Sequence, residues 1–191
     1  MNLSDMHNIN LLIFNFINGG AGLYPALDVF LLFFTSYVAY GVSIGIGMYM
    51  TVVVPMRIED GYKSIAAFKR GLELCISALT TWLIVKIIKT LIASPRPFIT
   101  LTDIQVLSPH ESGYSFPSGH TSMTTAIATV VYFYNKRLGT LLYLFALVVA
   151  ISRIYVGVHY PIDVVAGFLI GILVPWGIHY VVIKRQQSQK K

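Results

Sequence analysis

Long apolar runs constrain this chain more than any other feature of its sequence. Of its 191 residues, 55% are hydrophobic and 12% are charged, whereas a soluble domain carries about 25% charged residues. The runs at 25–55, 71–93, 138–157 and 162–183 are long enough for helices that cross a bilayer, which need roughly 20 residues. A shorter run at 120–135 gives a helix of about 24 Å, against a hydrocarbon core of about 30 Å. The sequence therefore predicts an integral membrane protein.

These runs predict an all-α fold, a polytopic transmembrane helical bundle with about five spans. Residues 3–18 are apolar on one side and too short to span, so we expect an interfacial helix there. No hydrophilic stretch is long enough for a second domain, and residues 1–191 are expected to form a single membrane domain. The single cysteine, Cys75, lies in an apolar run and is expected to be a small buried apolar residue.

Positive charge is distributed unevenly between the predicted loops. Five spans place the loop 55–70, the turn 135–138 and the tail 184–191 on one side of the membrane, with ten of the 14 Lys and Arg residues. Because loops rich in Lys and Arg stay in the cytoplasm, we predict a cytoplasmic C-terminus in a multi-pass protein of the cytoplasmic membrane. The net charge of +6 then reflects membrane topology, and no nucleic-acid partner is expected. The ten residues are Arg57, Lys63, Lys69, Arg70, Lys136, Arg137, Lys184, Arg185, Lys190 and Lys191.

Three short polar stretches interrupt the apolar sequence at the opposite, outer face. They are KTLIASPRP at 89–97, PSGH at 117–120 and SRIYVGVHYPID at 152–163. Together they supply three cations, two histidines, a hydroxyl and a carboxylate. This set suits a phosphate ester, with cations for its oxygens, one histidine to attack and one to protonate the leaving group. Because the surrounding sequence is apolar, the expected substrate is a lipid.

The first two stretches each allow a structural alternative. Lys89 and Arg96 are seven residues apart, about two helical turns, and can converge as an anion clamp. Taken alone, however, this stretch favours a pair that anchors the helix to the headgroups. Ser118 is suited to cap a helix and Gly119 allows close backbone approach, so this helix start can bind phosphate. His120 can donate a proton there. The alternative is a plain helix cap with a histidine at the membrane interface.

The third stretch is the most informative. His159 and Asp163 are one helical turn apart, and a carboxylate that accepts from one imidazole nitrogen leaves the other nitrogen free to attack. Pro161 lies between them and is expected near the first position of the last helix. Arg153 is close enough in sequence to reach the same anion. A structural Arg–Asp pair is the less favoured alternative, because ionisable groups in membrane segments are usually functional.

The pattern K-x6-R-P, P-S-G-H and S-R-x5-H-x3-D resembles the three-part signature of the type 2 phosphatidic acid phosphatase superfamily, over residues 89–163. The resemblance implies that His159 attacks phosphorus, that Asp163 orients His159 and that His120 protonates the leaving oxygen and then activates water. It further implies that the phosphoryl oxygens are bound by Lys89, Arg96, Ser118, Gly119 and Arg153. It also implies that the reaction needs no metal and no cofactor. Larger bacterial members have six spans, whereas we count five here.

The predicted function is therefore hydrolysis of a lipid phosphate or diphosphate through phosphohistidine. Similarity to small bacterial members favours undecaprenyl diphosphate, with undecaprenyl phosphate and phosphate as products. Phosphatidylglycerophosphate or phosphatidate hydrolysis and lipid phosphotransfer stay open, because all of them share the phosphohistidine. A transporter would distribute polar residues through several spans at mid-depth, and a scaffolding protein would not need two histidines beside three cations.

Four further residues carry smaller expectations. Glu73 lies within a turn of Lys69 and Arg70 and is expected to pair with them, and His179 is expected to be structural. In the loop 98–116, His110 and Glu111 precede PSGH and fit solvated loop residues better than a gate over the site.

Overall fold

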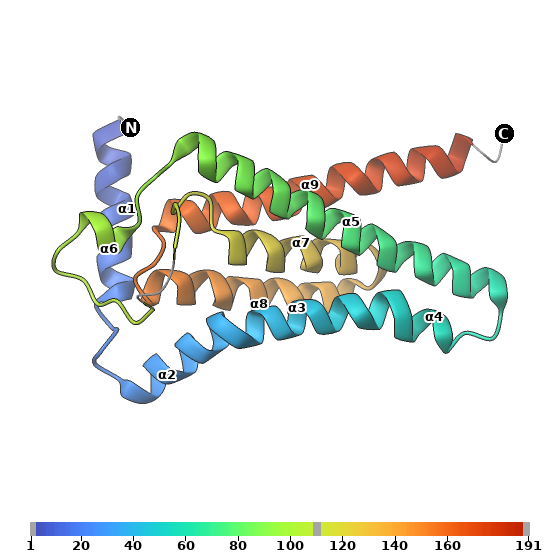
Figure 1. Ribbon diagram of the computed structural model, residues 1–191, viewed down its shortest axis with the longest axis horizontal. Helices are drawn as coiled ribbons and strands as arrows, with labels where there is room; N and C mark the ends of the chain where they lie inside the picture. Colours follow the sequence, from blue (N-terminus) through green and yellow to red (C-terminus); the bar gives the residue numbers. More distant parts are fainter. Residues whose placement is uncertain (1–2, 109–111, 189–191) are drawn as a thin grey trace.

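The computed structural model describes residues 3–108 and 112–188, and helix is the only regular secondary structure within them. The long helices lie along the long axis of the molecule, and the short helix α1 (Leu3–Asn18) stands across one end of them (Figure 1). Four segments of the described chain are long and apolar enough to cross a membrane. The all-α transmembrane fold predicted from the apolar runs is therefore confirmed. The four segments are Pro25–Met56, Gly61–Thr100, Lys136–Tyr155 and Pro161–Arg185.

The first candidate span is one continuous helical run with two π-helical turns. Pro25 occupies its first turn, where a missing N–H costs nothing because that donor has no partner inside a helix. Much of its apolar surface is exposed, including Val29 and Phe30, as expected for side chains that face lipid. The run consists of α2 (Pro25–Phe33), η1 (Phe34–Val38), α3 (Ala39–Met48), η2 (Tyr49–Val53) and α4 (Val54–Met56).

Helix α5 (Gly61–Ile92) begins earlier than the apolar pattern indicates. We expected a loop through residue 70, and this was wrong for 61–70. The Asp60 side chain accepts hydrogen bonds from the backbone N–H groups of Tyr62 and Lys63, so it caps a helix whose first turns are polar. Helix α5 ends in Ala93, which has a left-handed conformation with φ of 50°, and the short α6 (Pro97–Thr100) follows.

Helix α7 (Gly119–Tyr134) lies at the centre of the bundle and packs against α5, α8 (Lys136–Tyr155) and α9 (Pro161–Ser188). Small residues permit this close approach. A Cβ added at Gly139 would lie 2.3 Å from the Tyr132 Cα, and one at Gly171 would lie 2.6 Å from the Ser122 carbonyl oxygen. These glycines allow the backbones of α8 and α9 to contact α7, which therefore sits enclosed by its neighbours.

Helix α1 covers the end of the bundle at which α9 begins (Figure 1). Phe14 is fully buried and clusters with Ala150 and Ile154 of α8 and Val164 of α9. The Asn10 side chain accepts a hydrogen bond of 3.0 Å from the Ile162 N–H. A short helix that lies across the ends of membrane-length helices supports the expectation of an interfacial helix.

The expected pairing of Glu73 with Lys69 and Arg70 was wrong. Glu73 is buried, and its carboxylate accepts hydrogen bonds from the Tyr134 hydroxyl and from His179 Nδ1. Its position faces α7 and α9, where donors from those helices reach it, whereas the long Lys and Arg side chains extend to the exposed surface.

Candidate active site

The three polar stretches meet at one end of the bundle, beside α1 (Figure 1). Lys89 lies in the last turn of α5, and Arg96 follows in the turn before α6. His120 lies in the first turn of α7, and Arg153 in the last turn of α8. His159 lies in the connection between α8 and α9, outside the candidate spans, with Asp163 in the first turn of α9, which begins at Pro161 as predicted.

His159 and Asp163 are in direct contact, and both are about 1% exposed. The His159 Nδ1 and Asp163 Oδ2 atoms are 3.3 Å apart. The same carboxylate oxygen accepts a hydrogen bond from the Tyr160 N–H at 2.8 Å. With Nδ1 directed at the carboxylate, Nε2 is the nitrogen available to attack an electrophile.

Ser115 is a third member of this cluster, and the sequence did not single it out. It is fully buried, and its hydroxyl donates to Asp163 Oδ2 and lies 3.4 Å from His159 Nδ1. The only sequence signal was its place two residues before PSGH, in a loop whose path the sequence does not specify. Ser115 belongs to the candidate site because it orients the carboxylate that orients His159.

The surroundings of His159 favour its neutral form. Burial lowers the pKa of its imidazole well below the usual 6.5, and the positive charges of Arg153, Arg96, Lys89 and His120 lower it further. Both causes disfavour the imidazolium ion. A neutral imidazole at neutral pH retains the lone pair that a nucleophile needs.

Lys89 and Arg96 hold the loop that carries Ser115. Lys89 Nζ donates to the carbonyl oxygens of Tyr114 at 2.6 Å and Ser115 at 3.0 Å. Arg96 donates from Nε to the Gly113 carbonyl, from Nη2 to that of Ser112 and from Nη1 to that of Val158, at 3.0–3.1 Å. The two cations therefore position Ser115 and the His159 segment, a function that the expected anion clamp did not include.

Arg153 is fully buried, and its Nη1 donates to the Thr35 hydroxyl of η1 at 3.3 Å. Thr35 was also missed, because a lone threonine within an apolar run gives no signal of its partner. Helix η1 belongs to the first candidate span. That span thus contributes to positioning the guanidinium beside His159.

The start of α7 combines a buried hydroxyl with the second histidine. Ser118 is the N-cap residue by position, but its hydroxyl accepts from Thr121 Oγ1 at 3.0 Å instead of capping a backbone N–H. His120 packs edge-on against Tyr40 of α3, with 4.7 Å between the ring centroids. A Cβ added at Gly119 would meet only Val85 Cγ1, at 3.9 Å, so packing within the described chain does not require glycine there.

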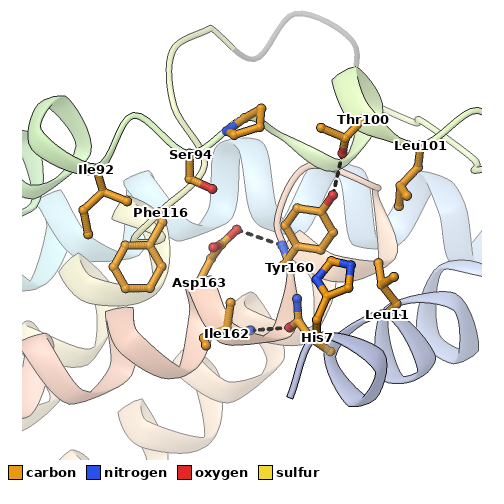
Figure 2. A pocket seen from close by; sticks show the side chains of 12 residues that line it. His7, Leu11, Ile92, Ser94, Thr100, Leu101, Phe116, Tyr160, Ile162 and Asp163 are labelled. Atoms are coloured by element: carbon orange, nitrogen blue, oxygen red, sulfur yellow. Dashed lines mark hydrogen bonds between the residues drawn. The ribbon is translucent and has the colours of Figure 1, made fainter. Parts of the chain in front are cut away.

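A cavity of about 520 Å³ lies between α1 and the segment that joins α5 to α6 (Figure 2). Leu11, Ile92 and Phe116 contribute apolar side chains, and Asp163 lies at its wall. The Tyr160 hydroxyl, also at the wall, is 2.6 Å from Thr100 Oγ1. The mostly apolar cavity therefore reaches Asp163, a candidate catalytic residue. His110 and Glu111 lie outside the described residues.

Comparison with known proteins decides the family. A model of the PAP2 superfamily matches residues 70–187, more than half of the chain. The chain belongs to the PAP2 superfamily. It is therefore a membrane phosphatase, a hydrolase of phosphoric esters, as the three-part signature predicted.

Relatives over most of the chain agree with this assignment. The undecaprenyl-diphosphatase BcrC of Bacillus subtilis is 31% identical over 87% of this chain and 80% of its own length. The protein named bacitracin transport permease protein BcrC of Bacillus licheniformis is 33% identical, over 86% and 76%. Among solved structures, LpxE of Aquifex aeolicus superposes with a TM-score of 0.71 at 31% identity, covering 90% of this chain and 95% of the other.

In the described part of the chain, no three His, Cys, Asp or Glu side chains gather in a way that could hold a metal ion. Metal independence remains a prediction about the reaction, and chelation tests it.

Proposed function

We propose that this PAP2 phosphatase hydrolyses undecaprenyl diphosphate to undecaprenyl phosphate and phosphate. The observation that carries the proposal is the buried pair of His159 and Asp163 beside an apolar cavity, at the end of a membrane bundle. The similarity to an undecaprenyl-diphosphatase over most of both chains supports this choice of lipid. The relative named as a transport permease has similar coverage, but transport does not need a buried nucleophile held by a carboxylate.

In the proposed reaction, His159 Nε2 attacks the terminal phosphorus. A phosphorus–nitrogen bond forms, and the bond from this phosphorus to the bridging oxygen breaks. His120 gives its proton to that oxygen, which leaves on undecaprenyl phosphate. A water molecule that gives a proton to His120 then attacks the phosphohistidine and breaks the phosphorus–nitrogen bond. This step releases phosphate and returns His159 to its neutral form and His120 to its protonated form.

The remaining predicted residues stabilise the charge that develops on phosphorus. Arg153, Lys89 and Arg96 supply positive potential around His159, as their effect on its pKa indicates. Ser118 and the backbone N–H of Gly119 lie at the start of α7, where free N–H groups favour an anion. The absence of a side chain at Gly119 leaves room there for the phosphoryl oxygens.

We place this site at the outer face of the cytoplasmic membrane, with the C-terminus in the cytoplasm. The support is the charge distribution, because ten of the 14 Lys and Arg residues lie in segments at the other end of the bundle or in the tail. Undecaprenyl diphosphate would then enter from the outer leaflet, with its chain in the cavity between α1 and α5.

The test is phosphate release by the purified protein in EDTA. The substrate panel is undecaprenyl diphosphate, phosphatidylglycerophosphate and phosphatidate. We expect the diphosphate to give the highest kcat/KM, and we expect His159→Ala to lose at least roughly a thousandfold in kcat, since it removes the nucleophile. An unchanged melting temperature of the variant would show that it is folded. Activity that survives this substitution, or that needs a divalent metal, contradicts the mechanism, and preference for another lipid contradicts the substrate.

A further inference from the structure

A second polar cavity lies at the opposite end of the bundle from the candidate active site. It has a volume of about 610 Å³ and is lined by residues of α5, α7 and α9. Its origin is a difference in helix length. Helix α7 has 16 residues and ends at Tyr134, whereas α5 has 32 and α9 has 28, so α5 and α9 continue past the end of α7 (Figure 1).

A satisfied carboxylate lies on the wall of this cavity. Glu73 is 4% exposed and accepts hydrogen bonds from the Tyr134 hydroxyl and from His179 Nδ1, the latter at 2.7 Å. Phe133 stacks on the His179 ring, with 4.0 Å between the centroids. These contacts hold the His179 ring in place and supply hydrogen-bond donors to the buried Glu73 carboxylate. The carboxylate therefore does not require a cation bound in the cavity.

Two neighbouring cations also line the cavity. Lys69 and Arg70 are exposed, and within residues 3–108 and 112–188 neither of them forms a salt bridge. The Arg70 guanidinium carbon lies 5.0 Å from the centroid of the Tyr134 ring, a cation–π contact that holds the charge near the cavity. A lysine and an arginine without carboxylate partners suit the oxygens of a phosphate group.

The surroundings of the cations match a lipid better than a free anion. Ile65 and Ile183 line the same cavity and are 57% and 41% exposed. They belong to the two helices, α5 and α9, whose apolar surfaces face the bilayer as candidate spans. A bound phosphate at Lys69 and Arg70 would thus have apolar surface beside it for the acyl chains of the same molecule.

We propose that this cavity binds the headgroup phosphate of an anionic phospholipid from the leaflet at that end of the bundle. The site is separate from the PAP2 active site, and the proposal does not depend on which substrate is hydrolysed there. A lipid bound between α5 and α9 would contact both of the long helices that carry residues of the active site at their other ends.

The test compares two double variants of the full-length protein. Lys69→Gln with Arg70→Gln removes the cavity cations, and Lys136→Gln with Arg137→Gln removes the same charge from the start of α8, outside the cavity. Native mass spectrometry measures binding of phosphatidylglycerol and of phosphatidylcholine. We expect the cavity variant to bind phosphatidylglycerol roughly 10- to 30-fold more weakly, since each basic residue near a membrane surface contributes about 1 kcal/mol. The affinity of the control variant for phosphatidylglycerol should change less than about twofold.

Three outcomes would overturn the proposal. If the two variants lose equal affinity for phosphatidylglycerol, only general surface charge is involved. The same holds if the protein does not bind phosphatidylglycerol more tightly than phosphatidylcholine. A second arm measures the melting temperature in millimolar inorganic phosphate. If free phosphate stabilises the protein and the cavity variant alone loses that effect, the ligand is a free anion and not a lipid. Phosphate release by the same variants separates a failure of this site from a failure of the proposed function.

Discussion

At the scale of single residues, one carboxylate oxygen organises the candidate site. Asp163 Oδ2 lies within contact of the His159 imidazole, the Ser115 hydroxyl and the Tyr160 N–H. Ser115 belongs to the loop before α7, His159 and Tyr160 to the connection before α9, and Asp163 itself to the first turn of α9. The carboxylate thus joins three parts of the chain around the proposed nucleophile. A change at any of these contacts should be felt in the orientation of His159 and hence in the rate of attack.

We expect Ser115→Ala to lower kcat by roughly tenfold to a hundredfold, because loss of a buried hydrogen-bond partner costs about 1–3 kcal/mol. The value of KM should change little, since Ser115 acts through Asp163. Steady-state kinetics on the diphosphate substrate measures both. Ser115→Thr keeps the hydroxyl and should restore most of kcat. Ser77→Ala is a matched control, because Ser77 is also fully buried but its hydroxyl has no hydrogen-bond partner among the described residues. Equal effects of the two alanine variants would refute the positioning role.

The depressed pKa of His159 predicts the acid side of the pH profile. In the proposed reaction the neutral imidazole attacks, so a lowered pKa keeps His159 able to attack as the pH falls through 6.5. The acid limb of kcat/KM, which reports the free enzyme, should therefore lie well below that value. Arg153→Gln removes the largest charge contribution and should move the limb to higher pH, whereas Arg153→Lys should not. Using one substrate throughout removes the contribution of substrate ionisation, and an unmoved limb in both variants would contradict the assignment of this pKa.

His120 as general acid predicts a dependence on the leaving group. Protonation by a side chain contributes roughly a hundredfold to ten-thousandfold when the leaving oxygen is basic. We expect His120→Ala to slow cleavage of an alkyl phosphate by that factor. Cleavage of p-nitrophenyl phosphate should slow much less, because its leaving group departs without a proton. The burst-phase rate of leaving-group release, as alcohol or as p-nitrophenolate, measures this first step on both substrates. An equal loss on both would assign His120 to binding instead.

How much of the site could be predicted from the sequence depends on how far apart the contacting residues lie along the chain. His159 and Asp163 are four residues apart beside a proline that starts a helix, so local geometry was enough to pair them. Ser115 and Thr35 are 48 and 118 residues from their partners Asp163 and Arg153, and only the packing of the helices brings them together. Glu73 was assigned to its sequence neighbours for the same reason, since its partners Tyr134 and His179 lie on other helices.

At the scale of elements, the apolar pattern predicted the helices but not all of their ends. Helices α8 and α9 lie within a few residues of the predicted 138–157 and 162–183. Helix α5 extends into polar sequence because a capping residue, and not hydropathy, decides where it begins. Helix α1 was predicted as an element, but its contacts with the start of α9 and its share in the cavity depend on tertiary packing.

If the lipid chain occupies the cavity beside α1, filling that cavity should affect long lipids selectively. We expect Leu11→Trp to raise KM for undecaprenyl diphosphate severalfold and to leave hydrolysis of a short-chain, water-soluble analogue unchanged. Leu12→Trp is the matched control, because Leu12 is the next residue on α1, is 69% exposed and is not part of the cavity wall. If both variants behave alike on the long lipid, the chain enters elsewhere.

At the scale of the whole molecule, two polar regions occupy the two ends of an apolar bundle. The candidate active site lies beside α1, and the cavity with Lys69 and Arg70 lies where α5 begins (Figure 1). The basic loops belong to the second end. This polarity along the long axis is what a protein that spans a membrane in one orientation requires.

Cysteine labelling can test that orientation. In a Cys75→Ala background, a cysteine at Asp103, in an exposed loop on the active-site side, should react with a membrane-impermeant maleimide in intact cells. A cysteine added after the C-terminus should react only after the membrane is permeabilised. Cys75 must be replaced because it is exposed, so the expectation that it is a buried residue was wrong. The reverse labelling pattern would place the active site in the cytoplasm.

The brevity of α7 has a consequence for the membrane around the protein. Its 16 residues give a length of about 24 Å, less than the roughly 30 Å of a hydrocarbon core, and polar residues lie at both of its ends. A flat bilayer of ordinary thickness therefore places one or both ends of α7 at the depth of the acyl chains. Because α5, α8 and α9 enclose α7, the bilayer meets those longer helices and not α7 itself. The neighbouring helices thus shield His120 and the polar end of α7 at Tyr134 from lipid, and the bilayer does not have to thin to accommodate a central helix of this length.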